Sequence, residues 1–180
     1  MPTFRTSPPA SQGAAVAARV LPSTPPHRPS HQPLYTPEER LRRDATRWTL
    51  VQGLLAPLQF VVFAISLTLV LRYLLTGQGL EAATTSVVIK TMLLYTIMVT
   101  GCIWEKVVFD CYLFAPAFFW EDVFSFLVLA LHTAYLVALY AGALGARGQM
   151  LLALAAYASY VVNATQFILK LRAARLGAPA

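Results

Sequence analysis

Charged side chains are scarce in this sequence. Asp, Glu, Lys and Arg make up only 12% of the 180 residues, whereas a soluble domain has about 25% because its surface faces water. Apolar residues make up 57% of the chain, and the mean hydropathy is +0.59. This composition excludes an ordinary water-soluble domain and indicates that much of the surface faces lipid.

Cysteine is also rare. Cys102 and Cys111 are nine residues apart, with no CxxC pair and no histidine at zinc-site spacing, so neither a disulfide framework nor a zinc site is predicted. The first 33 residues contain no continuous apolar run, so no signal peptide is predicted either. Most of the charges behind the net value of +6 flank apolar segments, which is typical of membrane topology rather than of nucleic-acid binding.

The N-terminal segment, residues 1–33, differs in composition from the rest. Nine of the 12 prolines fall at or before Pro37, and such a segment cannot bury enough apolar surface to offset its chain entropy. We therefore expect a disordered, basic tail. Order is expected to begin with a short surface helix from Pro37 to about Arg47, because Thr36 is a good N-cap and Glu39 occupies the capping-box position.

Four long apolar segments follow. The first has 23 residues without a charge, which is enough to cross about 30 Å of hydrocarbon. Short connections make neighbouring helices antiparallel, so the predicted fold is an all-α membrane protein with four transmembrane helices in an up-down bundle. The ordered domain is expected at residues 34–176, with spans at about 49–71, 82–104, 123–144 and 149–169, and with turns marked by Gly77, Gly79, Gly142, Gly145 and Gly148.

Basic residues near the ends of the spans predict the orientation. Eight fall on one side of the bundle and two, Arg72 and Arg147, on the other. Because cytoplasmic ends carry the excess of Lys and Arg, both termini and the connection between the second and third spans are expected in the cytoplasm. The eight residues are Arg40, Arg42, Arg43, Arg47, Lys106, Lys170, Arg172 and Arg175.

The connection between the second and third spans, residues 104–125, combines four carboxyl groups with bulky aromatic side chains. Trp-Glu steps at 104–105 and 120–121 end one helix and begin the next. Near a low-dielectric boundary a carboxyl group can hold its proton at neutral pH, and beside an ionised neighbour it forms a pair suited to general acid–base catalysis. The alternative is that these are solvated charges at helix ends, with Lys106 paired to Glu105.

Two basic residues, Lys90 and His132, lie inside the predicted spans. His132 lies about 16 Å along its helix from Glu121 at 1.5 Å per residue, so these side chains cannot form a catalytic pair directly. A histidine at that depth must face the bundle interior and is a candidate functional residue. For Lys90, we prefer the interpretation that the side chain snorkels toward the membrane surface.

Long stretches of the sequence resemble one enzyme family. They are YTPE from Tyr35, WTLVQGLLAPLQF from Trp48, VVIKTMLLYTIMVTGCIWEKVVF from Val87, YLFAPAFFWEDVFSFLVLALHTAYLVALY from Tyr112 and YASYVVNATQFILKLRAARL from Tyr157. On these residues the run from Tyr35 to Leu176 resembles the 3-vinyl (or 2-vinyl) bacteriochlorophyllide hydratases of bacteriochlorophyll biosynthesis. The resemblance implies a lyase in the inner membrane of a photosynthetic bacterium. It would add water to the C3 vinyl group of chlorophyllide a, giving a 1-hydroxyethyl group.

The resemblance brings no shared catalytic motif, so the roles of residues follow from the expected reaction. Glu121 or Asp122 is the predicted acid that protonates the terminal vinyl carbon, and Glu105 is the predicted base that orients the water. No cofactor or protein-bound metal is expected, because the magnesium belongs to the substrate. Substrate binding is assigned to His132 (as an axial ligand to that magnesium or a proton carrier), to Lys106 and Arg47 for the propionate, and to the rings of Trp104, Trp120 and Phe119.

Two other functions remain open. A non-catalytic pigment-binding or assembly protein would use His132 as a magnesium ligand and the aromatic side chains as a cradle. A transporter would place Lys90 and His132 along a proton path, but it would also need inverted repeats. The expected partners are a chlorophyllide-type tetrapyrrole, water, the lipid bilayer and other enzymes of bacteriochlorophyll biosynthesis, with no nucleic acid, and the active site is expected at the cytoplasmic face.

Overall fold

The computed structural model describes residues 34–176, so the predicted tail at residues 1–33 lies outside the described residues. Within them the chain forms five helices and no strand. Four helices are long and apolar enough to cross a membrane, which confirms an all-helical protein with four candidate spans. They are α2 (Arg47–Thr76), α3 (Leu80–Phe109), α4 (Phe119–Tyr140) and α5 (Ala146–Leu176).

The remaining helix, α1 (Pro37–Ala45), begins with the predicted capping box. The Thr36 hydroxyl accepts a hydrogen bond from the backbone N–H of Glu39, and the Glu39 carboxylate accepts one from the Thr36 N–H at 2.7 Å. Two otherwise unpaired N–H groups are thereby satisfied. The helix stops at Thr46 because this residue is extended and its hydroxyl caps the next helix by accepting from the N–H of Trp48.

Glycines shape both of the turns that the sequence marked. Gly77 ends α2 with φ 73°, and Gly79 precedes α3 with φ 83°, values that residues with a Cβ rarely adopt. The second turn begins earlier than predicted, because α4 ends at Tyr140 and Gly142 already has φ 58°. Gly148, which was expected in the turn, instead lies in the first turn of α5.

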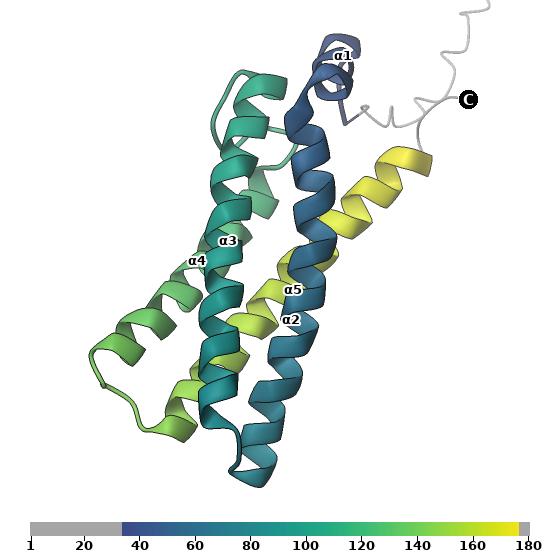
Figure 1. Cartoon of the computed structure of the whole chain (residues 1–180). Coiled ribbons are helices and arrows are strands. Elements are labelled where there is room, and N and C mark those ends of the chain that lie inside the picture. Colours follow the sequence, from purple (N-terminus) through teal and green to yellow (C-terminus); the bar gives the residue numbers. More distant parts are fainter. Residues whose placement is uncertain (1–33, 177–180) are drawn as a thin grey trace, which may run out of the picture. The chain divides into compact units, whose positions relative to one another are not determined.

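The long helices pack as two pairs, α2 with α3 and α4 with α5, and α5 crosses behind α2 and α3 in the view of Figure 1. Polar side chains bridge each pair near both ends, as expected where lipid gives no hydrophobic driving force between helices. The bridges are Ser66–Ser86 (2.7 Å) and Gln52–Thr100 (2.8 Å) between α2 and α3, and Asn163–Ser125 (2.9 Å) and Gln149 to the Tyr135 carbonyl (2.7 Å) between α4 and α5.

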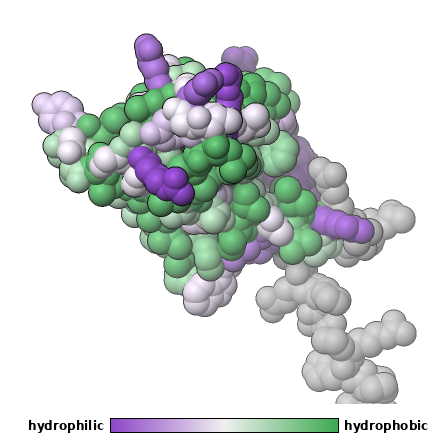
Figure 2. Space-filling view, turned by 90° about the horizontal axis from the view of Figure 1, so that it is seen from below, coloured by the Kyte–Doolittle hydropathy of each residue, from purple (hydrophilic) through white to green (hydrophobic). Residues whose placement is uncertain are grey.

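Apolar side chains lie on both the inside and the outside of the bundle. Phe63 of α2 packs against Tyr157 of α5 in the core, with ring centroids 5.4 Å apart. Large apolar residues such as Leu54 and Ile65 are exposed on the outer face of α2. Exposed apolar side chains along the length of a helix suit lipid rather than water. Figure 2 looks at the lower end of the bundle, where several hydrophilic side chains stand among hydrophobic ones.

Lys90 does not snorkel, so that interpretation was wrong. Its side chain is completely buried, and its ammonium group lies 3.9 Å from the centroid of the Tyr160 ring. The position of Lys90 on α3 directs it between the helices, where the faces of aromatic rings attract a cation. His132 of α4 is also completely buried, and therefore faces the bundle interior as predicted.

Candidate active site

Three acidic residues predicted to be catalytic lie close together at one end of the bundle. Glu105 comes from the last turn of α3, and Glu121 and Asp122 come from the first turn of α4. They are only 6%, 6% and 5% exposed, respectively. The alternative interpretation as solvated charges at helix ends is therefore wrong for all three.

Glu105 and Asp122 form a carboxyl pair, with their side chains near enough for each to shift the pKa of the other. The Oε2 atom of Glu105 is buried, and no N–H or O–H group reaches it among the described residues. Two carboxylates that are buried this close together repel each other strongly unless they share a proton. We therefore infer that the carboxyl pair holds one proton.

The loop between α3 and α4 holds the carboxyl pair through its backbone. The N–H of Phe114 donates to Asp122 Oδ2 at 2.7 Å, and the N–H of Ala115 interacts with the Glu105 carboxyl group. Phe114 has φ 59°, in the left-handed region, which costs a residue with a Cβ about 1–2 kcal/mol. The contacts around Phe114 must therefore hold it in this conformation.

Glu121 faces a different partner, Lys170 of α5. The Lys170 ammonium group donates to Glu121 Oε2 at 2.5 Å and lies 5.2 Å from the centroid of the Phe118 ring. From the sequence, Lys170 is one of the eight basic residues that predict the orientation, and no role at the site was predicted for it. Lys170 lies 11 residues after Ser159 and shares a helical face with Asn163 and Gln166. This polar face was the sequence signal that could have placed Lys170 inside the bundle.

Lys106 pairs with Asp110 rather than with Glu105. Its ammonium group lies 2.7 Å from Asp110 Oδ1 and 5.5 Å from the centroid of the Tyr112 ring. The hydrogen bond from Lys106 lowers the pKa of the exposed Asp110 carboxyl group. Lys106 thus lies at the surface near the loop, where an anionic ligand can reach it.

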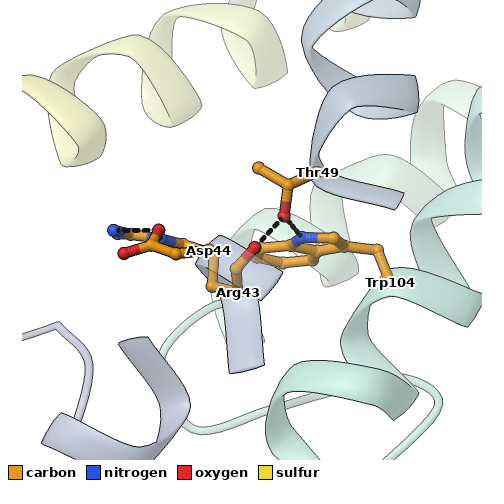
Figure 3. Close-up of polar contacts among 4 residues, drawn as sticks. All are labelled: Arg43, Asp44, Thr49 and Trp104. Atoms are coloured by element: carbon orange, nitrogen blue, oxygen red, sulfur yellow. Dashed lines mark hydrogen bonds and ion pairs between the residues drawn. The ribbon is translucent and has the colours of Figure 1, made fainter. Parts of the chain in front are cut away.

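Trp104 belongs to an inner aromatic cluster. Its ring packs against Phe109 and Phe118, with centroids 5.7 and 5.8 Å away. Figure 3 shows how its indole is fixed: the N–H donates to the Thr49 hydroxyl at 2.9 Å, and that hydroxyl donates to the Arg43 carbonyl at 2.6 Å. The hydroxyl of Thr49 therefore joins α1, α2 and α3. This placement makes Trp104 a packing residue as well as a candidate ligand contact.

Phe119 and Trp120 lie instead on the outside, in a group that we call the outer aromatic platform. It consists of Phe114, Phe119, Trp120 and Phe126. The Phe114 ring stacks on Phe126 at 5.6 Å with 15° between the planes, and lies 5.6 Å from Phe119, which in turn contacts Trp120 at 5.5 Å. All four side chains are exposed, Trp120 by 66%, so their rings are available to a flat ligand.

His132 is separate from the carboxyl pair. Asp122 is ten residues away on α4, which is about 15 Å along the axis. His132 Nδ1 lies 2.8 Å from the Val128 carbonyl, and Nε2 is buried with no partner among the described residues. If Nδ1 carries the proton, Nε2 presents a free lone pair. His132 contacts the Tyr157 ring at 5.9 Å.

No group of three or more His, Cys, Asp or Glu side chains in residues 34–176 is arranged to hold a metal ion. An apolar groove of about 220 Å³ lies between α2 and α5, and Tyr157 forms part of its wall. The groove therefore lies near His132 rather than near the carboxyl pair.

Comparison with known proteins identifies the family. A family model described as 2-vinyl bacteriochlorophyllide hydratase matches residues 35–173. A curated 2-vinyl bacteriochlorophyllide hydratase from Cereibacter sphaeroides is 74% identical over 143 residues, which are 79% of this chain and 89% of the relative. One from Rhodobacter capsulatus is 71% identical over 145 residues, 81% of this chain and 84% of the relative. No solved structure matches significantly. The matched region contains the carboxyl pair, α2, α3, α4 and most of α5, and the chain belongs to the 2-vinyl bacteriochlorophyllide hydratase family.

Proposed function

We propose that this protein adds water to the C3 vinyl group of chlorophyllide a or a related bacteriochlorophyllide, with the Glu105–Asp122 carboxyl pair as its acid and base. The observation that carries the proposal is this buried pair. It brings an acid and a base from two helices together in the region that matches the hydratase family. The names of the two relatives supply the substrate class.

Within the pair, we assign the shared proton to Glu105. Asp122 accepts a short backbone hydrogen bond from Phe114 and lies near the positive charge of Lys170, and both stabilise its ionised form. Glu105 interacts with the backbone N–H of Ala115, but its Oε2 atom has no donor among the described residues. Glu105 is then the acid and Asp122 the base, which reverses the order expected from the sequence. Glu121 is engaged by the ammonium group of Lys170, so we do not assign it as the proton donor.

The reaction needs no net proton from outside. Glu105 transfers its proton to the terminal vinyl carbon, and the resulting cation at the inner carbon is delocalised over the macrocycle. The oxygen of a water molecule bonds to that inner carbon while a proton of the water passes to Asp122. The pair again holds one proton, now on Asp122, and transfer within the pair restores the starting state. Because hydration moves no electrons to or from an external acceptor, we expect no redox cofactor.

His132 does not fit the same substrate pose. The 15 Å or so between it and Asp122 along α4 exceeds the distance from the central magnesium of a tetrapyrrole to a vinyl group at the ring edge. A substrate with its vinyl group at the carboxyl pair is therefore too short to be ligated by His132. Pigment binding without catalysis remains the second candidate. Its supporting observation is the free Nε2 atom of His132 near the apolar groove.

We further propose an up-down bundle with both termini and the carboxyl pair at the cytoplasmic face of the bacterial inner membrane. The cross-helix bridges support this arrangement, because residues late in α2 pair with residues early in α3, and the same holds for α4 and α5. The excess of basic residues at the end that carries the α3–α4 loop supports the orientation. Lys106, at that end, would attract the propionate of the substrate.

The test is to incubate the purified protein, in detergent micelles and without added cofactor, with chlorophyllide a. We expect a product that is one water heavier and whose new oxygen comes from labelled water. Folded protein that yields no such product would refute the proposed function. A shift of the pigment absorption band without any product would instead support the pigment-binding candidate.

A further inference from the structure

Phe114 is the residue that joins the outer aromatic platform to the carboxyl pair. Its ring is 42% exposed and stacks on Phe126. Its backbone N–H donates to Asp122 at 2.7 Å. The ring and the N–H therefore belong to one residue that contacts both an exposed aromatic surface and a buried carboxyl group.

The backbone of Phe114 makes this link sensitive to its surroundings. Its φ of 59° is uncommon for any residue with a Cβ and is a marked outlier for a bulky one. Such a conformation persists only where neighbouring contacts hold it. The visible contacts are Asp122 on one side and the rings of Phe119 and Phe126 on the other. A loss of ring contacts would free the N–H to move away from Asp122.

The platform suits a flat, apolar ring with an anionic arm. Its four rings are exposed and adjoin the loop that binds the carboxyl pair. Two residues before Phe114, the Tyr112 ring lies 5.5 Å from the Lys106 ammonium group, so a cation, which pairs with Asp110 in the structure, lies near the same loop. Aromatic stacking together with a nearby cation matches a tetrapyrrole that carries a carboxylate. It matches a lipid tail less well, because a flexible chain does not stack.

We propose that Phe114 is a positioning residue, whose ring holds the macrocycle of the substrate on the outer aromatic platform and whose N–H orients Asp122 toward the vinyl group. The proposal rests on the proposed function and deepens it. Neither Phe114 nor Phe126 touches the reacting carbons in this scheme. Substrate binding and the orientation of the base are thereby linked through one residue.

Four variants of the full-length protein in detergent micelles test this. Phe126→Leu removes a platform ring that makes no contact of its own with Asp122, and should raise KM roughly three- to ten-fold. Phe119 still packs on Phe114 in this variant, so kcat should fall less than in Phe114→Leu. Phe114→Leu should raise KM by a similar factor and also lower kcat roughly ten-fold. Phe114→Gly should keep the raised KM but recover most of that lost kcat, because glycine adopts positive φ without strain. Phe60→Leu removes an exposed ring on α2, far from the site along the chain, and should behave as the wild type.

Each outcome decides one part of the proposal. An unchanged KM in both Phe114→Leu and Phe126→Leu would overturn the platform as the binding surface. Equal kcat values in Phe114→Leu and Phe114→Gly would overturn the role of the N–H. Quenching of tryptophan fluorescence by chlorophyllide a measures binding separately from turnover. If the wild type binds but forms no hydrated product, the proposed function fails, while the effect of Phe126→Leu on binding still decides the platform.

Discussion

Removal of the Lys170 ammonium group should destabilise the protein chiefly through the loss of its ion pair with Glu121. Lys170→Met keeps the length of the side chain and its apolar stem but removes the charge. The Glu121 side chain is 8% exposed, and no other cation lies in an ion pair with it among the described residues. The variant therefore leaves a carboxylate buried without a counter-charge, which is the costly way to break a buried pair.

The expected magnitude follows from the geometry. A hydrogen bond to a charged group contributes about 1.5–3 kcal/mol, and we take the lower half of that range because Lys170 keeps 27% of its side chain exposed. Lys170→Met should thus lower the free energy of unfolding by about 2 kcal/mol. Glu121→Gln removes the same contact from the other side. In the double variant the two losses should overlap, leaving a coupling energy of about 1–2 kcal/mol.

Equilibrium unfolding with SDS in mixed micelles, followed by circular dichroism, measures all four members of this cycle. Arg172→Met is the matched control, since Arg172 is an exposed cation two residues further along α5, and it should change stability by less than about 0.5 kcal/mol. If the losses in the double variant add to within about 0.5 kcal/mol, Lys170 and Glu121 are not coupled and the reasoning fails.

Two further predictions concern the neighbourhood of the site. Thr49→Val leaves the Trp104 N–H and the Arg43 carbonyl without their hydrogen-bond partner, at a cost of about 1 kcal/mol each, so Tm should fall by roughly 4–8 °C. Thr49→Ser keeps the hydroxyl, so its Tm should stay within a degree or two of the wild type. Equal losses of Tm in both variants would contradict the role of the hydroxyl. Burial raises the pKa of the Cys111 thiol, so its thiolate, the reactive form, appears only at higher pH than in an ordinary cysteine. In a Cys102→Ser background, Cys111 should therefore react with iodoacetamide at pH 8 several-fold more slowly than free cysteine in the same micelles. An equal rate would contradict the burial of the Cys111 thiol.

The sequence predicted those features that local physics determines. The capping box at Thr36 and Glu39 and the glycine turn at Gly77 depend on neighbours within a few residues, and all are present in the structure. The four apolar helices follow from uninterrupted hydrophobic length. The end of α4 at Tyr140 was missed, because hydrophobicity continues through the following turn and only the backbone of Gly142 breaks the helix.

The arrangement of the site could be predicted only in part. Clustering of Glu105 with Asp122 was expected from their position at facing helix ends, but the partner of each carboxyl group was not. Lys170 lies 49 residues from Glu121, and no local pattern distinguishes a cation that bridges helices from one that marks membrane orientation. Lys90 was misjudged for a related reason, because burial depends on which helix face turns inward.

The central claim is that the Glu105–Asp122 carboxyl pair carries out the hydration, and the most direct measurement is the turnover of the pair's variants. Mass spectrometry of the product from chlorophyllide a in labelled water should show a loss of roughly 10²–10⁴-fold in kcat for Glu105→Gln and for Asp122→Asn. The double variant should lose little more than either single variant, because the two residues act as one unit. Wild-type turnover in a folded Glu105→Gln, Asp122→Asn double variant would contradict the account.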